Sequence, residues 1–405
     1  MNKVCVVGLG YIGLPTASLL AREGFNVHGV DVNSEVVQKI NHGEIHIHEP
    51  DLDVLVKSAV SQGDLTASLE PAPADVFIIA VPTPIKDEHV PDISYVEAAT
   101  RAIASYLEVG NLVILESTSP VGTTEQISNW LRELRPDLNA GSVYVAYCPE
   151  RVLPGQILKE LISNDRIVGG IDPASTTQAT AFYRKFVKGE VLPTQARTAE
   201  LAKLAENAFR DVNIAFANEL SLICENLDID IWELRELANR HPRVNILKPG
   251  PGVGGHCVAV DPWFIIHSAP EQARLLRTAR QVNGSKPHQV VNQVKAAATD
   301  FNQPVVACLG LAYKANIDDL RESPAVAIVR ELATEAVGHI LAVEPHISSL
   351  PANLDSLGSI QLVELEVAIK KADILVLLVD HQAFKNIDPE QFKARTVIDT
   401  RGFWH

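Results

Sequence analysis

The feature that most constrains the fold of this chain is a glycine motif directly after its first apolar run. The motif GLGYIG, residues 8–13, follows VCVV and opens a helical pattern, and Asp31 ends the next β-branched run, NVHGVD. Gly8, Gly10 and Gly13 would permit a tight turn and close approach of a pyrophosphate to a helix N-terminus. An acid at the position of Asp31 binds ribose hydroxyls and disfavours a 2′-phosphate. The motif therefore predicts a dinucleotide-binding fold that takes NAD rather than NADP.

Short β-branched runs alternate with helical patterns on either side of a helical middle. The first series occupies residues 4–8, 26–32, 75–81, 111–117 and 143–149, and the second occupies 304–314, 339–345, 373–381 and 396–404. Strands that alternate with helices predict βαβ units and parallel sheets. Between the two series, residues 198–227 contain no Gly or Pro, which predicts one long helix that bridges domains or forms a subunit interface.

We therefore predict an α/β fold with two Rossmann-like, doubly wound domains joined by a central helical domain that contains the long helix. At 405 residues the chain is too long for a single core. The expected domain boundaries are 1–195, 196–298 and 299–405. A shorter helix is expected over residues 271–283 of the central domain.

Composition narrows the classes of partner. The net charge is −15, which argues against a general affinity for nucleic acid or anionic membranes, so cations for an anionic ligand must be concentrated locally. The five cysteines lack paired spacing and favour a reducing, cytoplasmic compartment. No apolar run approaches the ~20 residues that span a bilayer, and the N-terminus has no signal-peptide pattern.

One cysteine lies on an unusually bare stretch of backbone. Residues 249–264 read PGPGVGGHCVAVDPWF, with Cys257 after four glycines and Asp261 four positions later. Because glycine lets a ligand approach the main chain closely, Cys257 is either a small residue in a turn or a nucleophile. As a nucleophile its thiolate would add to an aldehyde, and the thiohemiacetal would be oxidised to a thioester and then hydrolysed.

Polar residues on the long helix and in two loops are candidates to assist such a thiol. Lys203 and Asn207 are one helical turn apart, with Arg210 on the same side. The small apolar neighbours of Lys203 predict its partial burial. Asp261 and Glu150 could hold and activate a hydrolytic water. The alternative for Lys203, Asp261 and Glu150 is an ordinary solvated charge.

Hydroxyls at strand ends and a local set of cations complete the candidates. Thr83 follows one predicted strand and residues 117–124 follow another, where doubly wound sheets bind ligands. Thr124 could instead cap the next helix. The cations suited to an anionic ligand are Arg151, His241, Arg243, Lys314 and Arg321, some of which could be ordinary surface charges.

Seven motifs, in order along the chain, resemble one known family. They are GxGYxGLP, VPTP, STSPVGT, CPERVLPG, AELAKLAENAFRDVNIAFANE, GGHCVAVDP and GLAYKANIDDLRESP. Together they resemble the UDP-glucose/GDP-mannose dehydrogenase family over essentially the whole chain. The resemblance implies oxidation of a sugar C6 alcohol to a carboxylate with two NAD and one water. It also implies an NAD-binding first domain, a dimerisation domain in the middle and a UDP-sugar-binding last domain.

The resemblance also implies a role for each candidate residue. Cys257 would be the thiohemiacetal nucleophile and Lys203 its acid/base or charge-stabilising partner. The group around the thiol and the water would comprise Asn207, Asp261, Thr118 and Glu150. The implied NAD contacts, besides the glycines, are Tyr11, Ile12, Asp31, Thr83, Thr124 and Arg321. The implied UDP-sugar contacts are Arg151, Val152, Lys203, Asn207, Arg210, His241, Arg243, Gly254, Tyr313, Lys314 and Arg401.

Three segments are similar to the branch of the family that acts on 2-acetamido sugars. They are GGHC, the following VAVDPWF and the preceding HPRVN. The implied substrate is a UDP-N-acetylhexosamine, namely UDP-N-acetyl-D-mannosamine. UDP-N-acetyl-D-glucosamine or another UDP-hexosamine is the alternative, because the residues do not fix the configuration at C2 or C4. The family likeness further implies a homodimer or dimer-based oligomer, in which the HPR segment can serve the neighbouring subunit.

Other classes of function leave prominent residues without a role. A two-electron hydroxyacid dehydrogenase would use a dinucleotide domain and a helix lysine, but it would leave Cys257 and the last domain idle. A nucleotide sensor would need none of the thiol, lysine and carboxylates. A metal site is not expected, because His46 and His48 lie two positions apart without further matched ligands.

Overall fold

The computed structural model describes residues 2–138, 141–153, 155–255, 257–392 and 395–404. It forms two compact units, Met1–Ala205 with Trp263–Pro270, and Glu206–Pro262 with Glu271–His405. Two of the three boundaries between the units fall within helices, namely α8 (Ala196–Asn226) and α10 (Asp261–Ser268), and the third follows Pro270. The long helix predicted over residues 198–227 is thereby confirmed as α8, whereas the functional division at residues 195 and 298 stays a prediction.

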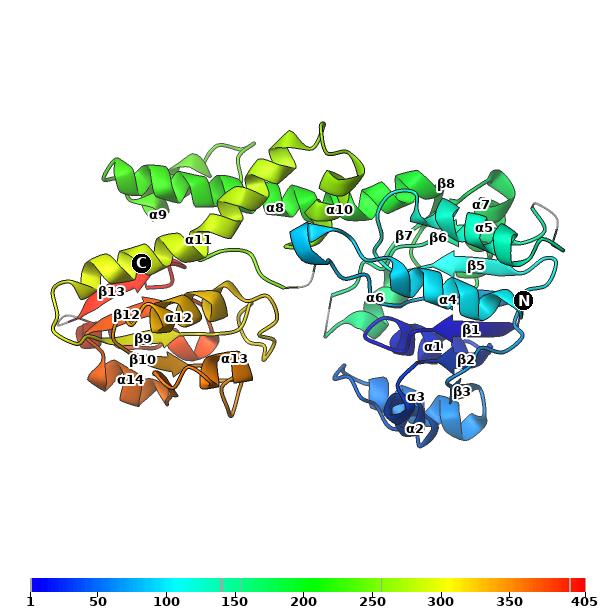
Figure 1. Cartoon of the computed structure of the whole chain (residues 1–405), viewed down its shortest axis with the longest axis horizontal. Helices are drawn as coiled ribbons and strands as arrows, with labels where there is room; N and C mark the ends of the chain where they lie inside the picture. The colour runs from blue at the N-terminus through cyan, green and yellow to red at the C-terminus, as the bar shows by residue number, and fades with distance from the viewer. Residues whose placement is uncertain (1, 139–140, 154, 256, 393–394, 405) are drawn as a thin grey trace. The chain divides into compact units, whose positions relative to one another are not determined.

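The first unit is built on an eight-stranded sheet with the order β3-β2-β1-β4-β5-β6-β7-β8 (Figure 1). Its strands are β1 (Lys3–Val7), β2 (Asn26–Val30), β3 (Leu65–Ser68), β4 (Val76–Ile79), β5 (Leu112–Leu115), β6 (Tyr144–Tyr147), β7 (Arg166–Gly170) and β8 (Val191–Gln195). Neighbouring strands pair in parallel except β6 and β7, which are antiparallel. The sequence patterns did not predict β3, β7 and β8, which lack the continuous β-branched or apolar runs of most of the other strands.

Helices cover both faces of this sheet. The helical elements are α1 (Gly13–Arg22), α2 (Ser34–Asn41), α3 (Leu52–Gln62), η1 (Asp87–His89), α4 (Ser94–Ala104), α5 (Thr123–Leu134), α6 (Ile157–Ser163) and α7 (Pro173–Tyr183). Val4 and Val6 of β1 pack with α1, α3, α6 and α7, whereas Cys5 and Val7 pack with α4 and α5. The strand order reverses between β1 and β4, so a ligand crevice is expected beyond the carboxyl ends of those two strands.

The second unit contains a five-stranded, wholly parallel sheet with the order β11-β10-β9-β12-β13. Its strands are β9 (Val305–Leu309), β10 (His339–Val343), β11 (Ile360–Leu362), β12 (Ile374–Leu377) and β13 (Thr396–Asp399). The order reverses between β9 and β12, as it does between β1 and β4 in the first unit. The prediction of two Rossmann-like, doubly wound sheets is therefore confirmed.

The helices of the second unit cover its sheet and form a helical layer with the later part of α8. They are α9 (Ile231–Ala238), α11 (Arg274–Ala298), α12 (Pro324–Thr334), α13 (Ala352–Asp355), α14 (Leu365–Lys371), η2 (Gln382–Phe384) and η3 (Pro389–Phe392). Helices α11 and α12 pack on one face of the sheet and α14 packs on the other (Figure 1). Buried polar contacts join α8 to α11, among them the 2.7 Å ion pair of Asp211 and Arg280.

Helix α11 is much longer than the helix predicted over residues 271–283. It continues through Gly284 and Pro287 to Ala298, two residue types that normally favour a helix end. Burial explains the continuation, because Val290, Val291 and Val294 belong to the core beneath α12. Across the described ranges, the helices are all too short or too polar to traverse a lipid bilayer.

Candidate active site

The glycine turn between β1 and α1 is shaped by the close approach of backbone to backbone. Gly8 has a φ of +92°, and a Cβ on it would lie 2.6 Å from the carbonyl oxygen of Ala80. A Cβ on Gly13 would lie 1.7 Å from the carbonyl oxygen of Gly8, whereas one on Gly10 would meet no atom within 4 Å. The fold therefore requires glycine at Gly8 and Gly13, whereas Gly10 leaves open space at the turn. No acidic side chain lies in the first turn of α1, so its amides suit a pyrophosphate.

Asp31 is tied to this turn by hydrogen bonds. Its carboxylate accepts the backbone N–H of Leu9 at 3.0 Å and that of Asn33 at 2.9 Å. The residue is half-buried, and it bonds to the same turn that contains Gly10. This arrangement fits an adenosine ribose of NAD, whose hydroxyls would donate to the carboxylate.

The loops after β4 and β5 lie together beyond the sheet. The Thr83 hydroxyl donates to the backbone carbonyl of Thr118, and the Ser117 hydroxyl donates to that of Val81 at 2.6 Å. Two predicted site residues, Thr83 and Thr118, are thus adjacent at the carboxyl edge. Both fit the place where a doubly wound sheet binds its ligand.

Thr124 is fully buried, and its hydroxyl donates to Glu200 of α8 at 2.6 Å. The same carboxylate accepts the backbone N–H groups of Gly122 and Thr124, so it caps the N-terminus of α5. Burial raises the pKa of Glu200, although these hydrogen bonds oppose the shift. The predicted contact of Thr124 with NAD would therefore have to share a hydroxyl that already has a partner.

Glu150 lies in a buried ion pair. Its Oε2 accepts from Nη1 of Arg166 at 2.8 Å, and both side chains are less than a tenth exposed. Arg166 comes from β7, a strand that the sequence patterns did not predict. One carboxylate oxygen is thus held by Arg166, and the other accepts the backbone N–H of Arg151 at 2.6 Å.

A second buried carboxyl group lies in the same cluster. Glu116 accepts a 2.7 Å hydrogen bond from the hydroxyl of Tyr183. Burial raises the pKa of Glu116 to about 7, with the positive charge of Arg166 opposing the shift. Burial likewise raises the pKa of the Cys148 thiol to about 12, which makes this cysteine a poor nucleophile.

Arg151 and Val152 begin a loop whose other end, at Gly155 and Ile157, is bonded to Glu49. Arg151 is half-buried and donates from Nη1 to the carbonyl of Asp165 at 3.2 Å, and Val152 packs against the core. Glu49, only 3% exposed, accepts the backbone N–H groups of Gly155 and Ile157 at 2.8 and 2.7 Å. The acid next to His46 and His48 in the sequence therefore fixes the shape of this loop.

Lys203 on α8 is half-buried, as its small apolar neighbours predicted. Arg210, two turns further along the helix, is exposed. Lys203 belongs to the first unit, and Asn207 and Arg210 belong to the second.

In the second unit contacts link three predicted residues, Asn207, Asp261 and Cys257. The Asn207 amide donates to the carboxylate of Asp261 at 2.5 Å, and Asp261 is 3% exposed. The backbone N–H groups of Val260 and Asp261 donate to the carbonyl of Cys257 at 3.0 and 2.8 Å. Cys257 is therefore the start of the turn that leads into α10, and its half-buried side chain lies one turn before a buried acid.

The glycines before Cys257 allow the loop to pack on an aromatic side chain. A Cβ on Gly254 would lie 2.6 Å from the carbonyl oxygen of Glu322, and one on Gly255 would lie 2.8 Å from the ring of Tyr313. Gly255 also has a φ of +81°. Burial raises the pKa of Tyr313, and Asp319 and Cys257 add to the shift, which places the thiol within electrostatic reach of the tyrosine. His256 lies outside the described residues.

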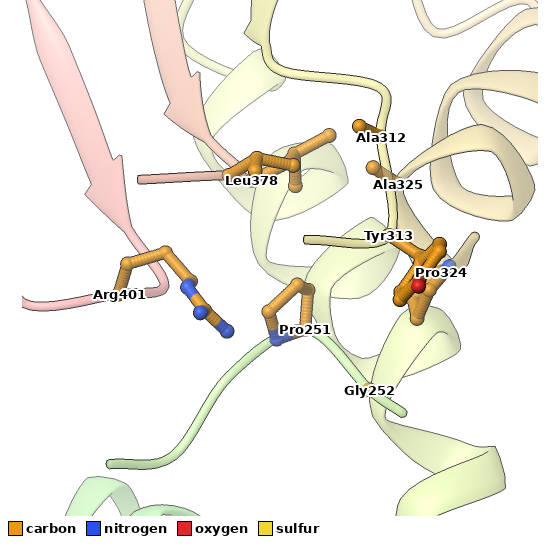
Figure 2. Close-up of a pocket in the computed structure, with 9 residues that line it drawn as sticks. Pro251, Gly252, Ala312, Tyr313, Pro324, Ala325, Leu378 and Arg401 are labelled. Atoms are coloured by element: carbon orange, nitrogen blue, oxygen red, sulfur yellow. The ribbon is translucent and has the colours of Figure 1, made fainter. Parts of the chain in front are cut away.

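A small pocket lies at the carboxyl edge of the second sheet, next to the point where its strand order reverses (Figure 2). It is lined by Pro251, Gly252, Ala312, Tyr313, Pro324, Ala325, Leu378, Val379 and Arg401. The Arg401 guanidinium donates to Asp380 at 2.9 and 3.1 Å, and a Cβ on Gly250 would meet its Nη1 at 2.5 Å. The pocket thus joins the loop that carries the thiol to an oriented arginine, a group suited to a phosphate.

The remaining predicted cations lie at the surface of the second unit. His241, Arg243, Lys314 and Arg321 are all exposed. The backbone N–H of Arg243 donates to Nδ1 of His241 at 3.3 Å, and the guanidinium of Arg321 pairs with Asp319. The structure does not gather these four side chains into one described pocket.

Several residues that hold the site together were missed in the sequence. Arg166, Glu116 and Glu200 are buried ionisable residues. Arg166 pairs with Glu150 and Glu200 bonds to Thr124, sixteen and seventy-six positions away, and Glu116 is buried in the same cluster as Glu150. Glu116 stands directly before the STSPVGT motif, which is the one local signal that could have drawn attention to it. The others carry no pattern of their own.

Comparison with known proteins gives matches along the whole chain. Residues 2–187 match the NAD binding domain of the UDP-glucose/GDP-mannose dehydrogenase family, residues 197–285 its central domain and residues 307–405 its UDP binding domain. An NDP-N-acetyl-D-galactosaminuronic acid dehydrogenase of Ralstonia nicotianae is 59% identical over the whole of this chain and 96% of its own length. A UDP-N-acetyl-D-mannosamine dehydrogenase of Yersinia pestis is 55% identical over the whole of this chain and 99% of its own.

Solved structures agree with the sequence matches. A UDP-D-ManNAc dehydrogenase from Pyrococcus horikoshii is 40% identical and superimposes with a TM-score of 0.88 over 100% of this chain and 96% of that one. A UDP-N-acetyl-mannosamine dehydrogenase from Staphylococcus aureus is 43% identical, with a TM-score of 0.86 over 99% of this chain and 95% of that one.

Proposed function

The chain belongs to the UDP-glucose/GDP-mannose dehydrogenase family, and from that premise we propose that it oxidises the C6 alcohol of UDP-N-acetyl-D-mannosamine to the carboxylate. It is an NAD-dependent nucleotide-sugar dehydrogenase. The choice of sugar rests on full-length relatives of that name at 55–56% identity. The four-electron outcome rests on one observation, a half-buried thiol at Cys257 one turn before the buried carboxylate of Asp261.

The first unit would hold NAD at the turn after β1. The residues proposed to bind it are Gly8, Gly10, Tyr11, Ile12, Gly13, Asp31, Thr83, Thr124 and Arg321. When bound, NAD accepts a hydride, and oxidation of an alcohol to an acid requires two such transfers. The open space at Gly10 and the anchored carboxylate of Asp31 fit this ligand.

Cys257 keeps the intermediate attached to the protein between the two oxidations. Its thiolate adds to the C6 aldehyde and forms a thiohemiacetal, in which the carbon still bears hydrogen. After the second oxidation the carbon is a thioester, which water cleaves to the carboxylate and the free thiol. A two-electron dehydrogenase has no need of this sulfur.

Lys203 and the carboxylates would move protons and steady charge during these steps. We assign to Lys203 the acid/base or charge-stabilising role at the sugar oxygen, because it is half-buried on α8. Asp261, held by Asn207, would orient the water that cleaves the thioester. Glu150 and Thr118 would assist that water, with Glu150 fixed by Arg166.

The pocket at the edge of the second sheet would take the uridine diphosphate. Arg401 lines it with a guanidinium held by Asp380, and Tyr313 provides an aromatic wall. Lys314 is exposed next to that tyrosine, where its charge would attract the diphosphate. The other residues proposed to hold the UDP-sugar are Arg151, Val152, Lys203, Asn207, Arg210, His241, Arg243 and Gly254.

A dimer built on α8 is part of this proposal. Phe209, Phe216 and Ile223 are spaced by seven residues, so they lie on one side of the helix, and each is about half exposed or more. An apolar stripe of this kind marks a protein interface. His241 and Arg243 are exposed in the same unit and would reach the substrate of the neighbouring subunit. The five free cysteines support a reducing, cytoplasmic location.

A second substrate has a specific observation in its favour. The Ralstonia relative, named for N-acetyl-D-galactosaminuronic acid, is 59% identical to this chain, a little more than the mannosamine enzymes named above. The chemistry at C6 would be the same, and only the configuration of the sugar would differ.

The experiment is to incubate the enzyme with NAD and each of three sugars: UDP-ManNAc, UDP-GlcNAc and UDP-GalNAc. NADH is counted per sugar consumed. The proposal expects two NADH per UDP-ManNAc and the highest kcat/KM for that sugar. A higher kcat/KM for UDP-GalNAc would support the second candidate, and one NADH per sugar with accumulating aldehyde would contradict the thiol mechanism.

A further inference from the structure

The loop after β9 repeats the backbone geometry of the glycine turn after β1. Gly310 has a φ of +94° and donates its N–H to the carbonyl of Val343 at 2.8 Å. Gly8 has a φ of +92° and donates to the carbonyl of Val30 at 2.8 Å. In both units a glycine therefore turns the chain at the end of the first strand, beside the strand that follows it in sequence.

An acid stands at the end of that neighbouring strand in both units. Asp31 accepts the N–H of the residue after Gly8, and Glu344 accepts the N–H groups of Leu311 and Ala312 at 2.7 and 2.9 Å. Glu344 thus occupies in the second unit the place of the ribose-binding acid in the first. Unlike Asp31, it is 5% exposed, so it is not available to a ribose.

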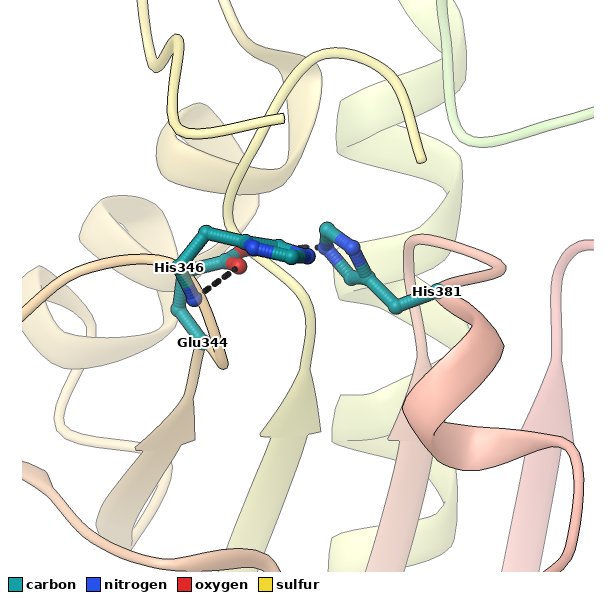
Figure 3. A group of neighbouring side chains, drawn as sticks. All are labelled: Glu344, His346 and His381. Carbon is teal, nitrogen blue, oxygen red and sulfur yellow. Dashed lines mark hydrogen bonds and ion pairs between the residues drawn. The ribbon is translucent and has the colours of Figure 1, made fainter. Parts of the chain in front are cut away.

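His381 is what covers this acid. Its ring is fully buried, and Nε2 lies 3.0 Å from the same oxygen of Glu344 that accepts the two loop amides (Figure 3). Burial by itself would raise the pKa of Glu344, but the hydrogen bonds from His381 and the two loop amides outweigh it and lower that pKa. The acid therefore stays ionised and keeps accepting from the loop.

Glu344, His346 and His381 have the composition of a metal site, and their potential ligand atoms lie within 4.8 Å of one another. The bonding argues against that use. Nδ1 of His381 accepts the backbone N–H of Asn316 at 2.9 Å, so Nε2 carries the proton that bonds to Glu344. The lone pair of Nδ1 is therefore used by the N–H of Asn316, and Nε2 carries a proton, so neither nitrogen of His381 is free to bind a metal.

These contacts hold both ends of one short loop. Glu344 fixes the loop at Leu311 and Ala312, and His381 fixes it at Asn316. Asn316 has a φ of +62°, and its side chain accepts the N–H of Gln382 at 2.8 Å. Between the fixed ends lies Tyr313, which lines the pocket with Ala312 (Figure 2). The loop can present its side chains to a ligand only in the shape that these bonds set.

We propose that Glu344 and His381 form a latch that positions loop 311–316 to bind the nucleoside diphosphate of the substrate. They are positioning residues, because they act through the loop and not on the reacting atoms. The nature of the ligand rests on the function proposed above, whereas the latch itself rests on the geometry of the second unit.

The test uses full-length protein with two substitutions that each keep one half of the latch. His381→Gln can still donate to Glu344, and His381→Asn can still accept from Asn316. Calorimetric titration with UDP and, separately, with NAD should show a Kd for UDP about tenfold higher in both variants, with the Kd for NAD unchanged. His346→Ala is the matched control and should bind UDP like the wild type. The hydrogen bond of His346 to Glu344 comes from its backbone N–H, and its ring belongs to an exposed residue beside the ring of His381, with centroids 5.1 Å apart.

Hydrogen exchange gives a readout that does not depend on the ligand. In the wild type the amides of Leu311, Ala312 and Asn316 should be protected. In His381→Gln the amide of Asn316 should exchange faster, and in His381→Asn those of Leu311 and Ala312 should, while the core of the first unit stays protected. Unprotected amides in the wild type, or wild-type UDP affinity in both variants, would overturn the latch. Zinc binding that is lost in His346→Ala would overturn it in favour of a metal site. Protected amides without any UDP binding would overturn the proposed ligand and leave the latch standing.

Discussion

The side-chain amide of Asn207 donates a 2.5 Å hydrogen bond to the carboxylate of Asp261. The backbone N–H of Asp261 in turn donates to the carbonyl of Cys257 at 2.8 Å. A helix residue thereby fixes a buried acid, and the acid is fixed to the backbone of the thiol. This chain of contacts links two residues fifty-four positions apart, both of which we propose to act on one intermediate.

Replacing the acid in this chain should slow the release of product. Asp261→Asn removes the base that we assign to the hydrolytic water, so kcat should fall by about 10²-fold or more while the Kd for NAD stays the same. Stopped-flow absorbance of NADH and calorimetric titration measure the two quantities. Asn213→Ala is the control on the same helix, because its amide bonds to the carbonyl of Phe209 within α8. A normal kcat in Asp261→Asn would remove Asp261 from the mechanism.

Two glycines of one turn should respond differently to the same change. Gly10→Ala adds a Cβ that meets no protein atom within 4 Å, so the protein should fold normally but bind NAD about tenfold more weakly. Gly13→Ala adds a Cβ 1.7 Å from the carbonyl oxygen of Gly8, so the free energy of unfolding should fall by about 2 kcal/mol or more. Denaturant unfolding and NAD titration separate the two effects. Equal loss of stability in both variants would show that the space at Gly10 is not kept for a ligand.

Asp31 should determine the choice between the two dinucleotides. Asp31→Ala removes a carboxylate that would accept from the ribose of NAD and repel a 2′-phosphate, so the ratio of the NADP to the NAD dissociation constants should fall by about tenfold or more. Fluorescence titration with each dinucleotide measures it. Asp53→Ala, an exposed change on α3, should leave the ratio as it is. An unchanged ratio in Asp31→Ala would place the ribose elsewhere.

Glu116 should make stability depend on pH. Burial raises its pKa to about 7, above the ~4.3 of an unfolded glutamate, so the folded state keeps a proton that the unfolded state releases between these values. The free energy of unfolding should therefore fall as the pH rises from about 4.5 to 7, by roughly 3 kcal/mol from this group. Urea unfolding across that range should show a smaller fall in Glu116→Gln. Glu97→Gln, which changes a partly exposed carboxylate on α4, should show the same dependence of the free energy of unfolding on pH as the wild type. If Glu116→Gln also shows the wild-type dependence, Glu116 does not titrate in this range.

The stripe on α8 should hold two subunits together. Phe216→Glu places a charge in the middle of the stripe, so the protein should become monomeric in multi-angle light scattering. If His241 and Arg243 serve the neighbouring subunit, the KM for the UDP-sugar should rise in parallel. Glu206→Lys, an exposed change near the start of the second unit, should not alter the mass. A Phe216→Glu variant that keeps the wild-type mass would show that the interface lies elsewhere.

The two sheets could be predicted from the sequence because each strand buried on both faces is a continuous apolar run. VFII of β4 and ILVL of β12 are examples. Strands such as LTAS of β3 could not be predicted, since pairing with β2 and not their own residues makes them strands. Helix α11 continued past Gly284 and Pro287 for a similar reason, because packing on the second sheet outweighs local preference.

The site shows the same division between local and distant signals. Cys257 and the glycine turn carry local patterns, so the amino-acid sequence alone was enough to single them out. Arg166, which pairs with Glu150, and Glu200, which caps α5, could not be found in this way, because their partners are sixteen and seventy-six or more positions away. The latch of Glu344 and His381 is likewise visible only in three dimensions, since thirty-seven positions separate the two residues.

The central claim is that the sulfur of Cys257 carries the sugar between the two oxidations. The most direct measurement is rapid-quench mass spectrometry of the peptide that contains Cys257, taken during turnover with NAD and UDP-ManNAc. The account predicts a transient mass increase on that sulfur equal to the acylated nucleotide sugar, absent in Cys257→Ser. Uronate that forms at the normal rate while the sulfur stays unmodified would contradict it.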